Sequence, residues 1–295
     1  MRDPYRSSLR RNARALALTA VFLLVRTACA EPAMWMIQDA DSTVYLIGTA
    51  HLLRHEAQWR SPKLDKALSA SSELWLEVPD PENEAAVLPL MQQYGIDRVT
   101  PLSRKLSAAQ NAKLAKAAAQ YGVSIANLEP LQPWAVALMF SVLPLQKAGY
   151  DPKAGVDLIL AHEAQKRGEK IVGFETLEEQ VRFLAEFPQP DQIAFLDETL
   201  DDVADGLAKT EKLAVAWING DTATIAALLD TELKRKEPAL YQKIIVDRNV
   251  RWADKIETLL RASGVQLIAV GAAHLVGPDS VQAQLAKRGI KAQSY

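Results

Sequence analysis

Two segments near opposite ends of the chain repeat one pattern, which ends in a histidine that could bind a ligand or transfer a proton. Residues 45–51 (YLIGTAH) and 268–274 (IAVGAAH) each contain an apolar run, a glycine, two small residues and a histidine. Gly48 and Gly271 allow a sharp turn or a close approach to a ligand at the end of a strand. In open α/β sheets, ligands bind beyond the carboxyl ends of the strands. The repeat therefore predicts that His51 and His274 face the same crevice.

A carboxylate completes this candidate site. Glu77 lies in the apolar run 74–78 (LWLEV), where a buried charge needs a cation, a metal or hydrogen-bond donors nearby. Two histidines and one glutamate suit a divalent ion that keeps open positions for water. We therefore expect manganese, cobalt or zinc at His51, Glu77 and His274. Two alternatives stay open: the histidines are structural, or Glu77 ends its strand in solvent.

Short apolar runs predict the strands that position these residues. Residues 44–47, 74–78, 171–174 and 267–270 have the nearly continuous apolar pattern of strands that are covered on both faces. Helices are expected around residues 62–68 and 280–287. This alternation predicts an α/β fold with a central mixed sheet, built from N-terminal and C-terminal strand–helix units.

The middle of the chain, residues 101–240, is mostly helical by its periodicity. No low-complexity linker separates it, so we expect a helical insertion or layer within one domain over residues 31–295. The apolar stretch 134–145 is too short to span a membrane. Helices are expected at 106–119, 134–145, 156–166, 177–187, 192–217 and 222–233.

Residues 1–30 have the pattern of a signal peptide. Arginines precede an apolar run at 15–25, and small residues at Ala28 and Ala30 suit cleavage before Glu31. We therefore expect an exported, periplasmic protein that has no membrane attachment after cleavage. A membrane anchor is a weaker alternative. A lipoprotein attached through Cys29 ranks lower too, because Arg26 stands where that motif requires an aliphatic residue.

Charge and cysteine content argue against two classes of function. Six of the 34 Lys and Arg residues but one of the 36 Asp and Glu residues precede Glu31, so the mature chain is more acidic than the whole. An acidic chain without a basic face argues against nucleic acid as a partner. The single cysteine leaves with the signal peptide, which excludes a thiol nucleophile in the mature chain. The oligomeric state has no signature in the sequence.

Taken in order, these motifs resemble the TraB/GumN family, which is related to the Tiki metalloproteases and more distantly to the erythromycin-esterase-like and haem-uptake ChaN-like fold. The resemblance extends from about Ala33 to Gly289. Individual motifs are short, but their order and spacing are specific. The matching positions are Gly48–His51, Glu77, Gly155 with Asp157, Gly173 with Glu175, Thr176 and Gln180, Arg248 with Asn249 and Trp252, and Gly271–His274.

The resemblance implies metal-dependent hydrolysis of a peptide or another small molecule, with His51, Glu77 and His274 holding the metal or its water. The ion would lower the pKa of a bound water and polarise a carbonyl. In the related esterase-like fold a comparable histidine acts as a base without metal. A metal-free hydrolase with His51 as base and Glu77 orienting it is therefore a second hypothesis. A non-catalytic protein that binds haem, metal or a glycan is a third.

Further residues receive expected roles around this centre. Arg248 is the candidate to stabilise an oxyanion or hold a substrate carboxylate, because its planar fork suits both; the alternative is a surface charge on a helix. Asn249 is expected to orient one imidazole, and Glu175 to be a further ligand or a partner of Arg248. Asp157 is a candidate site residue because it matches a position of the family that the chain resembles. His55, four residues after His51, is secondary because its neighbours are charged.

Overall fold

The computed structural model describes residues 31–203, 206–229 and 233–295, so the expected signal peptide lies outside the described residues. Within these ranges, six strands form one mixed sheet of order β4-β3-β5-β2-β1-β6. The strands are β1 (Met34–Gln38), β2 (Ser42–Thr49), β3 (Glu73–Leu76), β4 (Lys170–Gly173), β5 (Gly264–Gly271) and β6 (Gln293–Ser294).

The sheet joins the two ends of the chain. Strand β5, from the C-terminal part, lies between β2 and β3 and is parallel to both, and β4 extends the parallel set beyond β3. Strands β1 and β6 close the other edge in antiparallel pairing. The predicted α/β fold with a mixed sheet of N-terminal and C-terminal strands is confirmed.

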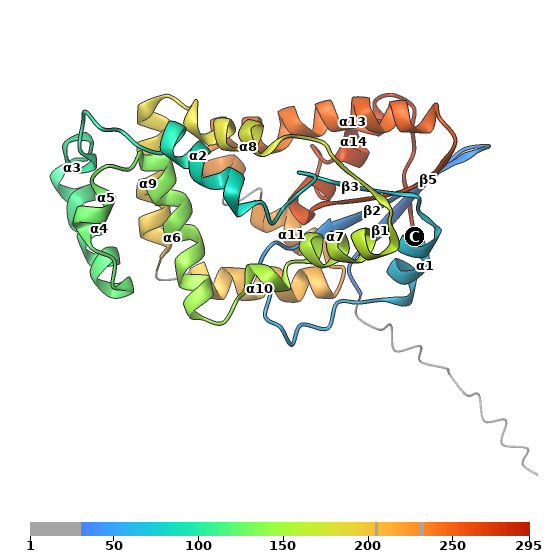
Figure 1. The fold of residues 1–295 in the computed structure, drawn as a ribbon, viewed down its shortest axis with the longest axis horizontal. Coiled ribbons are helices and arrows are strands. Elements are labelled where there is room, and N and C mark those ends of the chain that lie inside the picture. The colour runs from blue at the N-terminus through green and yellow to red at the C-terminus, as the bar shows by residue number, and fades with distance from the viewer. Residues whose placement is uncertain (1–30, 204–205, 230–232) are drawn as a thin grey trace, which may run out of the picture.

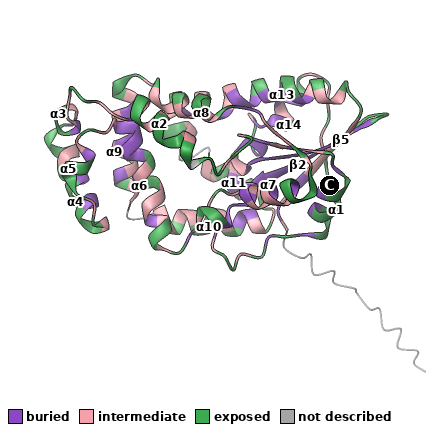
Figure 2. Ribbon diagram, in the orientation of Figure 1, coloured by how far each residue is buried: buried purple, intermediate pink, exposed green. Residues whose placement is uncertain are grey.

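Helices cover both faces of this sheet (Figure 1). Apolar residues of α1 (Pro62–Ala70), α7 (Val156–Arg167), α10 (Gly206–Ile218) and α11 (Thr222–Leu229) pack against one face. Those of α13 (Asp247–Leu260) and α14 (Val281–Ala286) pack against the other. Strands β2 and β5 are consequently buried along most of their length, as Figure 2 shows. This double cover explains why their sequences are apolar at successive positions instead of alternating.

A third apolar cluster lies among helices away from the sheet, at the left of Figure 1. We call it the helical lobe; its core comes from α3 to α6 and α9. The mainly helical character of residues 101–240 is confirmed, with β4 inside that range. The helices not bounded above are α2 (Glu84–Tyr94), α3 (Leu102–Lys105), α4 (Ala108–Tyr121), α5 (Ile125–Leu128), α6 (Pro133–Lys147), η1 (Pro152–Ala154), α8 (Leu177–Ala185), α9 (Gln189–Asp202), α12 (Pro238–Tyr241), η3 (Gln242–Val246) and η4 (Ala272–Leu275).

One expected helix is interrupted, and the expected helix 222–233 lies partly outside the described residues, since α11 is described as Thr222–Leu229. The prediction of a single helix over 192–217 is wrong, because α9 ends at Asp202, Val203 is in a turn and α10 begins at Gly206. Glycine lowers helix stability at that point. Within the described ranges, no helix combines the length and the apolar character that crossing a membrane requires.

Candidate active site

The two histidine motifs meet because their strands are neighbours. In the parallel register of β2 and β5, Thr49 pairs with Gly271, so both strands end at the same edge of the sheet. His51 and His274 follow these strand ends by two and three residues. Glu77 follows β3, which flanks β5 on its other side. The sheet order thus brings together three residues that are far apart in the sequence.

Glu77 lies between the two imidazoles. Its Oε1 atom is 3.9 Å from His51 Nε2 and 3.8 Å from His274 Nε2. The same oxygen accepts a hydrogen bond from the backbone N–H of Gly271 at 2.8 Å. A Cβ atom on Gly271 would lie 3.0 Å from Glu77 Oε1 and 3.7 Å from His51 Nε2. The glycine of the second motif therefore keeps the space between these three groups open.

His51 is oriented from behind by Asp157, at the start of α7. Its Nδ1 atom lies 3.0 Å from Asp157 Oδ1, so Nδ1 carries the proton and Nε2 faces the crevice. The approach of α7 depends on Gly155, where a Cβ would lie 2.6 Å from the carbonyl oxygen of His51. The side chain of His51 is 53% exposed, whereas that of Asp157 is 17% exposed. The pair has the arrangement of a general base with its orienting carboxylate.

The surrounding charges favour the protonated form of His51. Desolvation of the ring opposes protonation, but the hydrogen bond and charge of Asp157, together with the charge of Glu77, outweigh it. They raise the pKa of His51 to about 9. The neutral form, which alone can accept a proton, therefore predominates only in alkaline solution.

His274, in contrast to His51, is held in its neutral form. Asn249 Nδ2 donates to the carbonyl of Asp279 at 2.8 Å, which turns Asn249 Oδ1 toward His274 Nδ1 at 2.6 Å. The proton of His274 is therefore on Nδ1, and its Nε2 lone pair accepts from Arg248 Nη1 at 3.1 Å. Burial, reinforced by the charge of Arg248, lowers the pKa of His274 to about 3. Asn249 thus contacts and orients an imidazole.

Arg248 uses all of its donors within the protein. Nε donates to Glu175, Nη1 donates to His274 Nε2 and to the carbonyl of Ile244, and Nη2 donates to Glu77 at 2.6 Å and to Glu175 at 2.8 Å. Its side chain is only 9% exposed. A guanidinium has five N–H donors, and these contacts occupy all of them. The geometry favours a positioning role for Arg248 over the substrate contact expected from its sequence.

The acidic partners of Arg248 are themselves well supported. Glu175 accepts further hydrogen bonds from Trp252 Nε1 at 3.1 Å and Arg251 Nη2 at 3.3 Å. Glu77 also accepts from Gln180 Nε2 at 3.0 Å. Burial would raise the pKa of Glu77, but the charge of Arg248, together with the two imidazoles and the hydrogen bond from the Gly271 N–H, outweighs it and holds that pKa well below its ordinary value. Glu77 is therefore a fixed negative charge beneath the two imidazoles.

One residue of the first motif was missed as a functional group. Thr49 is 3% exposed, and its hydroxyl is among the few buried side-chain polar atoms in the described ranges without a hydrogen-bond partner. Thr49 lines two cavities, of about 340 and 370 Å³, that His51 and Glu77 also line. The sequence indicated only a small residue here. An unsatisfied buried hydroxyl at a site is a signal that only the structure gives.

His55 lies apart from this centre. Its side chain is 68% exposed, and Nε2 contacts Asp151 Oδ2 at 2.8 Å. The described contacts of His55 thus connect it to Asp151 and not to Glu77. This exposed position is consistent with treating His55 as less important than His51 in the sequence analysis.

The donor atoms do not fit a three-ligand metal ion as they are arranged. His274 has one lone pair at Nε2, and Arg248 already donates to it. Over the ranges that the structure describes, no three His, Cys, Asp or Glu side chains are disposed to hold an ion. A metal at His51, Glu77 and His274 therefore stays a prediction, and it requires Arg248 to leave His274.

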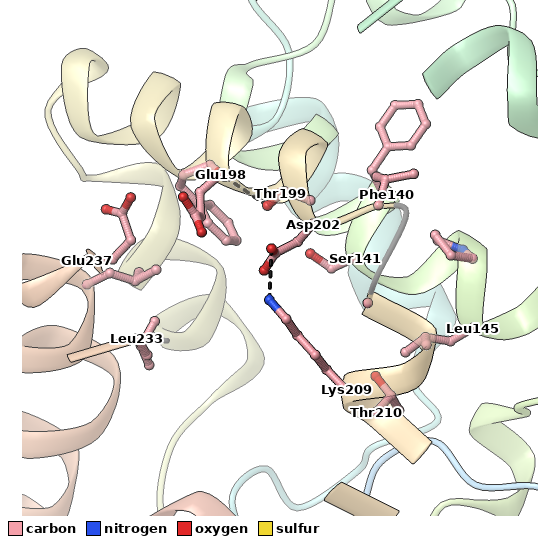
Figure 3. A pocket seen from close by; sticks show the side chains of 15 residues that line it. Phe140, Ser141, Leu145, Glu198, Thr199, Asp202, Lys209, Thr210, Leu233 and Glu237 are labelled. Atoms are coloured by element: carbon pink, nitrogen blue, oxygen red, sulfur yellow. Dashed lines mark hydrogen bonds and ion pairs between the residues drawn. The ribbon is translucent and has the colours of Figure 1, made fainter. Parts of the chain in front are cut away.

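A further cavity lies between the helical lobe and α10. Its volume is about 280 Å³, and it is lined by residues of α6, α9 and α10, among them Phe140, Thr199 and Lys209. Figure 3 shows Lys209 and Asp202 facing each other across this space, with 2.9 Å between Nζ and Oδ1. The residues that line it do not include His51, Glu77, Arg248 or His274.

Comparison with known proteins places the chain in a family. The model of the TraB/PrgY/gumN family matches residues 33–294. The chain belongs to this family. Its members include YbaP of Escherichia coli K12, which is 23% identical over 256 residues, 86% of this chain and 92% of YbaP. A protein of Treponema pallidum is 21% identical over 272 residues, 88% of this chain and 81% of its own length. No solved structure matches the chain. Both relatives are described as uncharacterised, so they add no activity to the family membership.

Proposed function

We propose that this TraB/PrgY/gumN-family protein is an exported, periplasmic hydrolase of peptide-like amides or esters, in which His51 moves the protons. The observation that carries the proposal is the pairing of His51 Nδ1 with Asp157 at 3.0 Å, which leaves Nε2 directed toward Glu77 without reaching hydrogen-bond distance. An imidazole backed by a carboxylate is a common general base. It differs from the sequence hypothesis in that Asp157, and not Glu77, orients the ring.

In the proposed reaction, neutral His51 Nε2 removes a proton from water while the water oxygen bonds to the substrate carbonyl. The proton then passes from Nε2 to the leaving nitrogen or oxygen as its bond to the carbonyl carbon breaks. Glu77 stabilises the imidazolium that forms between these steps, since its charge lies 3.9 Å from Nε2. The free hydroxyl of Thr49 is the donor proposed for the carbonyl oxygen of the substrate.

A metal-dependent version of the same hydrolysis is the second candidate. His51 Nε2, Glu77 Oε1 and His274 Nε2 converge around the space that Gly271 leaves open. If Arg248 released His274, these atoms would be available to a manganese, cobalt or zinc ion, which would polarise a water or a carbonyl. In either version, Arg248, Asn249 and Glu175 position the groups that act.

The decisive experiment measures cleavage of a peptide and ester library by untagged protein with and without a chelator. The metal-free mechanism predicts unchanged rates after chelation and a loss of about 10²–10⁴-fold in His51→Gln. Loss of activity on chelation, restored by one added metal, would favour the second candidate. If wild type and His51→Gln cleave nothing and yet bind a ligand, the hydrolase proposal fails and a binding role replaces it.

The role of Thr49 has its own test. Thr49→Val removes a hydroxyl that has no partner, so the free energy of unfolding should stay the same or rise by about 1 kcal/mol. If the hydroxyl donates to the substrate in the transition state, kcat/KM should fall by about 10-fold or more. Thr49→Ser keeps the hydroxyl and serves as the matched control. Equal rates for the valine and serine variants would contradict the role.

A further inference from the structure

The larger cavity beside the candidate active site has walls of two kinds. Its volume is about 370 Å³, within the usual range of small-molecule sites, about 300–1,000 Å³. Its lining includes the polar groups of the site: His51, Glu77, Arg248 and His274. Apart from Thr210, the lining residues of α10, α11 and the π-helix η3 are aliphatic or aromatic, and we call them the apolar wall; they include Leu213, Ala214, Trp217, Ile225, Leu229 and Ile244.

This apolar wall presents no charge to a ligand. Trp217, its only aromatic ring, donates its Nε1–H to the carbonyl of Gly48 at 2.8 Å, so its one polar atom is already satisfied. The charges that line the cavity are engaged with each other, since Arg248 contacts both Glu77 and His274. A charged group placed against α10 and α11 would lose its hydration without gaining a partner. An apolar group would instead gain by leaving water.

We propose that this cavity receives an uncharged aliphatic group of the substrate, of the size of a leucine side chain or somewhat larger. The inference rests on the proposed function, because the group must be joined to the carbonyl on which His51 acts. His51 and Thr49 line the cavity, so an aliphatic group next to that carbonyl lies within its reach. The substrate class is then an amide or ester with an aliphatic residue beside the cleaved bond.

Binding measured without turnover tests this assignment. The probes are the N-acetyl amides of leucine, glycine, lysine and aspartate, titrated by calorimetry into the wild type and into His51→Gln. Burial of the leucine side chain predicts a Kd about ten- to a hundredfold lower than for the glycine probe. The lysine and aspartate probes should bind no more tightly than glycine. His51→Gln allows the same probes to be measured in the absence of turnover.

A matched pair of variants on α10 localises the binding. Ala214→Trp fills the cavity from its wall and should abolish the preference for leucine. Val215→Trp places the same side chain on the neighbouring position, which is 59% exposed, and should leave the preference intact. Thermal melting checks that each variant folds. Ile244→Phe narrows the same cavity from η3 and replaces Ala214→Trp if that variant does not fold.

The outcomes separate this inference from the proposed function. Equal binding of all four probes, binding of none, or a leucine preference that survives both cavity-filling variants overturns the assignment. Selective binding without cleavage of any amide or ester would support the cavity and reject the hydrolase. Cleavage by the wild type without any preference for an aliphatic residue would support the hydrolase and reject the assignment of the cavity.

Discussion

At the scale of single residues, the site holds two imidazoles in opposite protonation states around one carboxylate. His51 keeps its proton because Asp157 and Glu77 lie beside it, whereas His274 stays neutral because it is buried against Arg248. Two similar sequence motifs thus provide histidines that differ in protonation state. The first histidine is suited to moving protons, and the second, through its contact with Arg248, to fixing the position of Glu77.

Asp157→Asn should lower the pKa of His51 from about 9 toward its ordinary value, because the amide removes the charge that stabilises the imidazolium. NMR titration of the ring would show this directly. In the wild type the raised pKa contributes stability that is fully present below about pH 6.5 and is lost as pH rises through 9. The stability advantage of the wild type over Asp157→Asn should therefore shrink across that window. Because the proposed base is neutral His51, the ascending limb of kcat/KM should move to lower pH.

Asp151→Asn is the matched control for this experiment. It alters a second aspartate–histidine pair, with His55 at 2.8 Å, that lies outside the site. This variant should leave both the His51 titration and the rate profile unchanged. A His51 pKa that does not respond to Asp157→Asn would contradict the assigned pairing.

Arg248→Met should destabilise the protein strongly, because it leaves Glu77 and Glu175 buried without their cation. Breaking one partner of a buried ion pair typically costs about 3–5 kcal/mol. Arg251→Met provides the comparison, since Arg251 is 47% exposed and contacts Glu175 at 3.3 Å; its loss should cost less than about 1 kcal/mol. Urea unfolding measures the free energy of unfolding of both variants. Similar losses for the two variants would mean that Arg248 is not the central cation of this cluster.

At the scale of elements, the parallel pairing of β2 with β5 produces the site. Its components were predictable from the sequence because the doubly covered strands carry continuous apolar runs that end in a Gly-x-x-His motif. Strands β1 and β6 were missed, since β1 has only five residues and the edge strand β6 has only two. The sequence offered Glu175 as a partner of Arg248, but the contact of Asp157 with His51 and those of Arg248 with Glu77 and His274 depend on how α7 and α13 pack. Periodicity gives no information on such packing.

Gly48 illustrates how tightly the two motifs pack. A Cβ there would lie 2.9 Å from the backbone Cα of Ala272, so Gly48→Ala must move one strand end relative to the other. Overpacking of this kind costs about 1–3 kcal/mol. Gly206→Ala is a suitable control, because a Cβ at Gly206 would meet no atom of the described residues within 4 Å. Gly48→Ala should also reduce activity, measured alongside thermal melting. A Gly48→Ala protein as stable and active as Gly206→Ala would show that the close approach is unimportant.

At the scale of the whole molecule, the apolar interior is divided. Two clusters sandwich the sheet, and a third belongs to the helical lobe of α3 to α6 and α9. The site residues lie at the edge of the sheet, and its apolar cavity is bounded by α10 and α11, which pack on the sheet. The lobe is therefore expected to open independently of the site, because cooperative units tend to follow contiguous packing.

Phe140→Ala tests this division from inside the lobe. Phe140 is 1% exposed and packs against Tyr121, so its truncation should cost about 3–5 kcal/mol. If the lobe opens as its own unit, hydrogen exchange should accelerate in α4 and α6 while β2 and β5 keep their protection. Leu138→Ala, on the same helix but 43% exposed, should change exchange little in either part. Equal acceleration in the lobe and the sheet would instead mean that one cooperative unit holds both together. In that case, mutations far from His51 would reach the site through global unfolding, and loss of activity alone would be a poor guide to which residues act in it.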